Sequence, residues 1–156
     1  MAKKEAVTDI WVHGLLQDAG IALDPQGSSI LEINNALKTA SKSGSGKVGF
    51  PEFVGVVKDF ILVIENKADL SKHIKLDKNG IVSADLSDVK NHAVNGAIFY
   101  GQHLAKNTSY KKVIAFGISG DEKKHKISPI YIDETECYRE LPDVESFISF
   151  TKKNID

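Results

Sequence analysis

Apolar residues recur at helical spacing in two segments of the first quarter of the chain. Thr8 to Ala19 carries such a stripe, and Gly20 follows it, a residue that suits the end of a helix. The spacing returns from Ile30 to about residue 42, and Ser29-Ile30-Leu31-Glu32 matches a capping box at its start. We therefore expect two helices, with a turn at Asp24-Pro25-Gln26-Gly27 between them.

The next segment has the pattern of a β-hairpin. Phe50 to Lys67 is rich in β-branched and aromatic residues, and only Lys58-Asp59 interrupts it. Residues 69 to 86 are more polar, with Lys78-Asn79-Gly80 as a turn, and they predict a short hairpin or an irregular excursion.

The second half predicts helices and strands in alternation. Ser87 is placed to cap a helix that runs to about Lys106, and apolar strands at residues 113–118 and 127–132 follow it. Pro142-Asp143 opens a final predicted helix. This order indicates one α/β domain over residues 1–156, with a central mixed sheet flanked by helices.

Composition limits how such a domain would meet a nucleic acid. The net charge is −1, and Arg139 is the one arginine among 20 basic residues. Lysine neutralises phosphate as a point charge, whereas arginine is the usual two-pronged reader of guanine edges. Contact with a DNA backbone is therefore expected, and direct base readout is not.

Other classes of site are not indicated. The single cysteine, Cys137, excludes an internal disulfide and a cysteine-based zinc site. The glycine-serine loop at residues 41–47 fails the P-loop pattern, because Ser41 and Val48 stand where glycine and Ser or Thr are needed. No apolar run has membrane-spanning length and no secretion signal is evident, so we expect a cytoplasmic protein without a membrane partner.

The hairpin carries the strongest candidate chemistry. If Lys58-Asp59 is a two-residue turn, Glu52 faces Glu65 across the strands. Alternation then puts Glu65 and Lys67 on one face, so two carboxylates and an ammonium converge. Mg²⁺ takes oxygen ligands, commonly one or two carboxylates with waters. The predicted ligands of Mg²⁺, or of Mn²⁺ in its place, are Glu52, Glu65 and the carbonyl of Asn66. Lys67 is predicted to stabilise negative charge on a phosphate at this metal.

A Glu-x-Lys sequence on a strand is, by itself, usually a solvated ion pair. Here the glutamate ends the continuous apolar run of residues 60–64, which is typical of a buried central strand. Charge in such a strand is costly unless it has a purpose, and this favours a site.

These residues resemble the PD-(D/E)XK nuclease motif. The similar segments are Phe50-Pro51-Glu52-Phe53-Val54 and Phe60-Ile61-Leu62-Val63-Ile64-Glu65-Asn66-Lys67, and the resemblance continues through residues 93–100 and 113–118. They resemble the motif especially as it occurs in the N-terminal nuclease domain of type I restriction-enzyme R subunits, and similar domains begin some fused, type IIG-like restriction-methylation enzymes. The resemblance implies a restriction-endonuclease-like core and a catalytic set of Glu52, Glu65 and Lys67, with Glu32 added from the preceding helix.

Several positions leave alternatives open. Glu52 replaces the usual aspartate of the motif, and Asp59 is an alternative second acid, although it falls in the predicted turn. Glu32 is either the additional acid or only a member of the capping box. Asn95-x-x-x-Phe99 departs from the Gln-x-x-x-Tyr often found in the family, and we assign it no catalytic role. Three further clusters are phosphate-binding surfaces or solvated faces: Lys72-His73, Gln102-His103 and Lys123-Lys124-His125-Lys126.

The resemblance implies an Mg²⁺-dependent DNA endonuclease domain of a restriction-modification system, with little sequence readout of its own. The chain has neither a motor P-loop nor a methyltransferase motif, so a fragment or subunit is implied. The implied partners are DNA and the motor, methyltransferase or specificity parts of a larger restriction enzyme. Two alternatives remain: a non-catalytic interaction module on the same fold, and a stand-alone repair or RNA nuclease.

Overall fold

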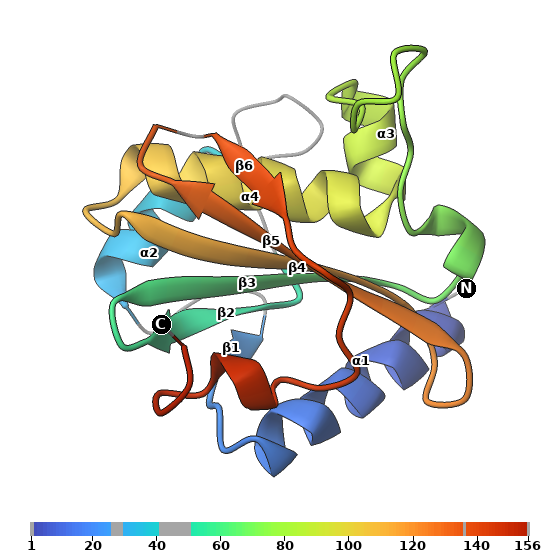
Figure 1. Ribbon diagram of the computed structural model, residues 1–156, viewed down its shortest axis with the longest axis horizontal. Coiled ribbons are helices and arrows are strands. Elements are labelled where there is room, and N and C mark those ends of the chain that lie inside the picture. The colour runs from blue at the N-terminus through green and yellow to red at the C-terminus, as the bar shows by residue number, and fades with distance from the viewer. Residues whose placement is uncertain (1, 26–29, 41–50, 136, 156) are drawn as a thin grey trace.

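A six-stranded mixed sheet with helices on both faces forms the centre of the molecule (Figure 1). The computed structural model describes the chain except for residues 1, 26–29, 41–50, 136 and 156. The α/β class and the helix-flanked mixed sheet expected from the sequence are confirmed, and the arrangement is compatible with a restriction-endonuclease-like core. In the described residues, no helix is both long and apolar enough to cross a membrane.

The strands lie in the sheet in the same order as in the chain. They are β1 (Asp24–Pro25), β2 (Phe53–Val57), β3 (Phe60–Lys67), β4 (Lys112–Gly120), β5 (His125–Asp133) and β6 (Tyr138–Glu140). Only the β3–β4 pair is parallel. A parallel pair needs a crossover connection, and α4 is the long helix between these two strands.

Helices cover the sheet from both sides. They are α1 (Ala2–Asp18), α2 (Leu31–Leu37), α3 (Leu86–Asn91) and α4 (Ala93–Asn107), with short 3₁₀ turns η1 (Leu70–Lys72) and η2 (Ile148–Phe150). Figure 1 shows α2 and α4 on one face, with α1 and the C-terminal segment on the other.

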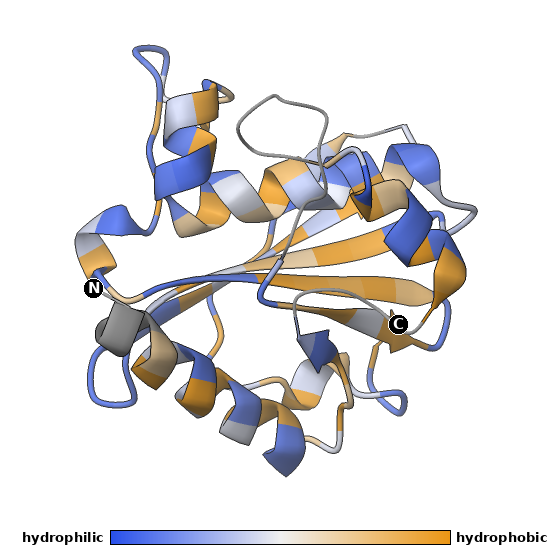
Figure 2. Ribbon diagram, turned by 180° about the vertical axis from the view of Figure 1, so that it is seen from behind, coloured by the Kyte–Doolittle hydropathy of each residue, from blue (hydrophilic) through white to orange (hydrophobic). Residues whose placement is uncertain are grey.

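Alternation along β3 divides the apolar core in two. Ile61 and Val63 pack under α2 and α4, whereas Phe60, Leu62 and Ile64 pack toward α1 and the C-terminal segment. Figure 2 shows the strands as predominantly hydrophobic ribbons between these layers. Because both faces are covered, the strand reads as a continuous apolar run instead of an alternating one.

The predicted hairpin register is confirmed. Val57 pairs with Phe60, and the ladder continues in the same register to Phe53 and Ile64. The turn residue Lys58 has φ of 55°, the left-handed backbone conformation that tight two-residue hairpin turns require.

Four other expectations need correction or lie outside the described residues. No α-helix follows Pro142: Val144 instead bridges to Ile127, and only the 3₁₀ turn η2 forms in the described C-terminal segment. The helix expected from Ser87 to Lys106 is broken at His92, whose φ of −128° and ψ of 140° are extended. The loop at residues 41–47 and the capping residue Ser29 lie outside the described residues.

Candidate active site

The hairpin brings Glu52 next to the end of β3. The ladder ends at the Phe53–Ile64 pair, so Glu52 lies one residue beyond it. Its backbone N–H nevertheless donates to the Ile64 carbonyl oxygen at 3.0 Å. Glu52 and Phe53 thus both lie against Ile64, the two-against-one pattern of a β-bulge, which re-aims the side chain at a strand end. The backbone of Glu52 is therefore held beside the residue that precedes Glu65.

Glu65 is buried under the first turns of α4. Its side chain is 2% exposed, and a Cβ built at Gly96 would lie 3.1 Å from its Oε2 atom. Gly117, the β4 neighbour of Glu65, allows the same close approach, because a Cβ there would lie 2.6 Å from the Cα of Val94. Two glycines therefore let α4 press onto the sheet at the glutamate, and the positive end of the helix dipole favours a negative charge there.

Lys67 lies at the C-terminal end of β3 and is half-buried. Strand alternation places it on the same face as Glu65. Among the described residues its ammonium has no ion pair or hydrogen bond, so Glu65 and Lys67 are not paired with each other. The strand therefore presents a lysine near a buried carboxylate without joining the two in a salt bridge.

Asn66, between them, faces α1. Its Nδ2 donates to Oδ1 of Asp9 at 2.8 Å, and its buried side-chain Oδ1 has no hydrogen-bond partner among the described residues. The side chain of Asn66 thus ties β3 to α1 on the far side of the sheet from Glu65. The backbone carbonyl is consequently the oxygen of Asn66 that stays relevant to the predicted metal site.

Glu32 lies away from Glu65. Its two carboxylate oxygens accept hydrogen bonds from the N–H and the hydroxyl of Ser109, at 2.7 and 2.8 Å. Ser109 follows the C-terminal end of α4, whereas Gly96 and Glu65 meet near the other end. Gly96 to Asn107 spans about 16 Å at the helical rise. The structure does not bring Glu32 to the other candidate residues.

Asp59, the alternative second acid, lies at the opposite end of β3. It is exposed in the hairpin turn and forms a salt bridge with Lys112 at 3.3 Å. Hydrogen bonding to Lys112 lowers the pKa of Asp59 below its usual value. Six residues separate it from Glu65, about 20 Å along a strand. The structure therefore favours Glu52 over Asp59 as the companion of Glu65.

Asn95 holds the polar excursion that the sequence predicted between β3 and α3. Its side-chain amide accepts from the N–H of Lys75 at 2.9 Å, and donates to the carbonyls of Lys75 and Ser83, both at 2.9 Å. These two residues are on opposite legs of a small hairpin that turns at Gly80. Asn95 is thus a buried clamp that joins the two legs of this hairpin.

A hydrogen-bond chain centred on the buried His73 links the end of β4 to β5 and the C-terminal segment. The Ser128 hydroxyl donates to the Asp143 carboxylate, so the Ser128 oxygen accepts from Nε2–H of His73. The other ring nitrogen of His73, Nδ1, then accepts from the Ser119 hydroxyl. The donor–acceptor distance is 2.7 Å in all three hydrogen bonds. Burial lowers the pKa of His73 to about 4. Ser119 is the β4 neighbour of Lys67, so this hydrogen-bond chain fixes the end of β4 that lies beside the lysine.

The sequence missed this chain because its four residues are far apart and none has a motif spacing. The sequence left Lys72-His73 as either a phosphate-binding surface or a solvated face, and for His73 the structure contradicts both, because this side chain is buried. Over the described part of the chain, no three His, Cys, Asp or Glu side chains form a cluster suited to a metal. The Glu52 and Glu65 carboxylates with a backbone carbonyl are a smaller set, of the size that Mg²⁺ completes with water.

Comparison with known proteins finds a relative along the whole chain. The chain is 35% identical over 158 aligned positions to the Type II restriction enzyme and methyltransferase RM.BcgI of Heyndrickxia coagulans. The match covers all of this chain and 25% of that protein, so the chain spans about a quarter of its relative. No protein-family model and no solved structure matches the chain.

Proposed function

We propose that this domain, similar throughout to one part of a restriction enzyme and methyltransferase, is the nuclease part of a restriction-modification system. The proposal is that it hydrolyses phosphodiester bonds of DNA with Mg²⁺. One observation carries it: the Glu52 backbone is bonded to Ile64, the residue before the buried Glu65, and strand alternation puts Lys67 on the face of Glu65. The resemblance of the same residues to the PD-(D/E)XK motif supports it.

The two carboxylates would hold the metal. Glu65 is fixed by α4 through the close approach of Gly96, and Glu52 is fixed by its backbone bond to Ile64. The Asn66 carbonyl would add a third oxygen, and hard oxygen donors of this kind suit Mg²⁺. The bound metal would polarise a phosphoryl oxygen and acidify a water.

Lys67 would supply positive charge where the phosphate becomes more negative. Its ammonium has no partner among the described residues, so no ion pair has to break before it meets the substrate. Electrostatic stabilisation by a pre-positioned donor is commonly the largest contribution to such catalysis. The hydrogen-bond chain through Ser119 would keep the end of β4 beside this lysine in place.

Sequence recognition would come from other parts of a larger enzyme. The described surface offers one arginine, Arg139, on the edge strand β6, away from the candidate site at the end of β3. Direct readout of guanine relies mainly on arginine. Methyltransferase, motor or specificity parts of a restriction enzyme are therefore the proposed partners, and DNA is the proposed substrate.

A non-catalytic interaction module is the second candidate. That interpretation makes Glu52, Glu65 and Lys67 an ordinary ion-pair network, and the absence of any ion pair to Lys67 in the described residues counts against it. The buried carboxylate also counts against it, since burying charge without function is costly. Parallel cleavage assays of DNA and RNA distinguish the proposed DNA nuclease from an RNA nuclease.

The test is cleavage of plasmid DNA and of a matched RNA by the isolated domain with Mg²⁺ or Mn²⁺. We expect Glu52→Gln, Glu65→Gln and Lys67→Ala each to lower the single-turnover rate at least 100-fold. Metal titration should show weaker binding for the two glutamate variants and nearly unchanged binding for Lys67→Ala.

Exposed Glu134 and Lys111 are the matched controls, because Glu134→Gln and Lys111→Ala make the same chemical changes at the end of the sheet opposite Glu65. The proposal would be refuted by unchanged cleavage with the Glu65→Gln protein. It would also be refuted if no metal binds at about 10 mM, which corresponds to a binding free energy of only about 3 kcal/mol.

A further inference from the structure

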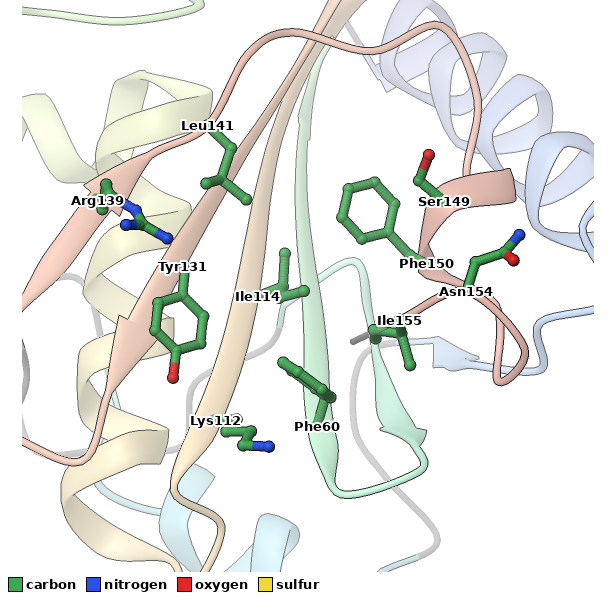
Figure 3. A pocket seen from close by; sticks show the side chains of 10 residues that line it. All are labelled: Phe60, Lys112, Ile114, Tyr131, Arg139, Leu141, Ser149, Phe150, Asn154 and Ile155. Atoms are coloured by element: carbon green, nitrogen blue, oxygen red, sulfur yellow. The ribbon is translucent and has the colours of Figure 1, made fainter.

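A cavity of about 400 Å³ lies on the other face of the sheet from Glu65. Its walls are the strands β3 to β6 and the C-terminal segment around η2 (Figure 3). It begins at Phe60, the first residue of β3, five residues from Glu65 and about 17 Å along the strand. The cavity is therefore separate from the candidate nuclease site, and its size is within the usual range for small-molecule sites.

Aromatic and aliphatic side chains form the body of this cavity. Phe60 and Phe150 are nearly buried and lie on opposite sides of it, one from the sheet and one from the C-terminal segment. Tyr131 presents its ring from β5, and Ile114 and Ile155 also line the cavity. Flat apolar walls of this kind accept a planar ring, because stacked and edge-on ring contacts are favourable.

Positive charge lies along one side of the cavity. Figure 3 shows Arg139, Tyr131 and Lys112 in a row along this wall. Backbone pairing between Tyr131 and Arg139 fixes these two neighbours. Arg139 is the one arginine of the chain, and within the described residues its guanidinium has no ion pair or hydrogen bond. An unpaired guanidinium beside an apolar cavity is suited to a carboxylate or phosphate held by two parallel hydrogen bonds.

Lys112 is only partly engaged by its own neighbours. Its ammonium lies 3.3 Å from exposed Asp59 and 5.1 Å from the centre of the Phe60 ring. The hydroxyl of Tyr131 has no partner in the described part of the chain. A second cation and a free hydroxyl therefore lie along the same wall as Arg139, and both can donate to an anion.

We infer that this cavity is a binding site for a small ligand in which a flat ring carries an anionic group. The ring lies between Phe60 and Phe150, and the anion meets Arg139, Tyr131 and Lys112. A nucleoside monophosphate has this chemistry, and so does an aromatic carboxylate. The inference is independent of the proposed nuclease function, because the site is on another face and at the other end of β3.

The test is equilibrium binding to the whole domain in EDTA, which removes any dependence on the nuclease site. The four probes are adenosine 5′-monophosphate, adenosine, inorganic phosphate and indole-3-acetate. We expect saturable binding of a ring-plus-anion probe with at least tenfold higher affinity than that of adenosine or phosphate. Which of the two ring-plus-anion probes binds more tightly identifies the phosphate or the carboxylate as the natural anion.

Variants separate this site from general attraction to a lysine-rich surface. Arg139→Gln should weaken binding about tenfold or more, since a charge-assisted hydrogen bond is lost, and Tyr131→Phe should weaken it severalfold. Lys123→Gln, an exposed lysine in the β4–β5 turn, is the matched control and should leave affinity unchanged. Arg139 is exposed, so its substitution is not expected to unfold the domain.

Methyl NMR provides a second measurement that does not depend on a variant. The Ile114 and Ile155 methyl signals should shift on titration with the bound probe. The inference would be overturned if none of the probes binds saturably at about 10 mM. It would also be overturned if Arg139→Gln and Lys123→Gln reduce the affinity equally, or if the chemical-shift changes are confined to other methyl groups. The 10 mM limit corresponds to a binding free energy of only about 3 kcal/mol.

Discussion

The buried histidine chain predicts how the stability of the domain depends on pH. His73 is 5% exposed, between Ser119 and Ser128, and burial lowers its pKa from 6.5 to about 4. Asp143 acts in the opposite direction and Lys126 in the same direction, but both effects are smaller than burial. The folded protein therefore holds His73 in the neutral form at pH values where the unfolded chain binds a proton.

The sign and the size follow from this difference. Because the folded pKa is below the unfolded pKa, the contribution of His73 to stability is complete above about pH 6.5 and is lost as the pH falls toward 4. Between pH 7.5 and pH 5.0 the unfolded chain gains most of its proton while the folded chain does not. Linkage with these two pKa values gives a loss of about 2 kcal/mol in the free energy of unfolding over that interval.

Urea unfolding at pH 7.5 and 5.0 measures the loss, with the wild type compared to His73→Gln. Carboxylates titrate in both proteins, so the difference between their pH dependences isolates the histidine. We expect the His73→Gln protein to be less stable than wild type at pH 7.5, and about 2 kcal/mol less sensitive to the change to pH 5.0.

His13→Gln is the matched control, because His13 is exposed and its removal should leave the pH dependence as in wild type. Equal pH dependence in the wild type and His73→Gln proteins would refute the argument. If His73→Gln does not fold, NMR of the His73 ring in the wild type gives its pKa directly. A His73 signal that titrates near pH 6.5 would contradict the burial of this side chain.

Three more substitutions test the packing around the candidate site. Gly96→Ala should destabilise the fold by about 1–3 kcal/mol and weaken metal binding, because the new Cβ would crowd Glu65 and the Val89 carbonyl; thermal unfolding and metal titration measure both, and unchanged metal affinity would contradict it. Glu32→Gln should cost about 1 kcal/mol in urea unfolding through its bonds to Ser109 and keep DNA cleavage, whereas loss of cleavage with an intact fold would make Glu32 catalytic. Asn95→Ala should cost about 1–3 kcal/mol and raise amide hydrogen exchange between residues 75 and 83; exchange like that of wild type would refute the clamp.

Local rules determined the central part of the fold. A two-residue turn at Lys58-Asp59 leaves one register for the strands on either side, and that register decides which face each side chain takes. The apolar run before Glu65 likewise indicated a strand covered on both faces, and Glu65 is buried. The hairpin, its register and the placement of Glu65 and Lys67 on one face could therefore be predicted from the order of residues.

The C-terminal segment shows where periodicity misled. Val144, Phe147 and Ile148 have helical spacing. The backbone N–H of Val144 instead donates a hydrogen bond to the carbonyl of Ile127 in β5. The ring of Phe147 packs edge-on against that of Phe116, with 5.1 Å between the ring centres. Short apolar spacing is compatible with both outcomes. The open side of the sheet decided between them, because an unpaired strand edge gains hydrogen bonds from any segment that can lie along it.

Sequence alone thus determined the hairpin and the residues that its strands present, because hydrogen-bond register and side-chain alternation act between near neighbours. Only the tertiary structure decided where Glu32 lies, since its partner Ser109 is 77 residues away. The same holds for the His73 chain and for the cavity beside Arg139, each assembled from elements distant in the sequence. Such contacts depend on how whole layers pack, and the spacing of residues along one segment carries no record of that packing.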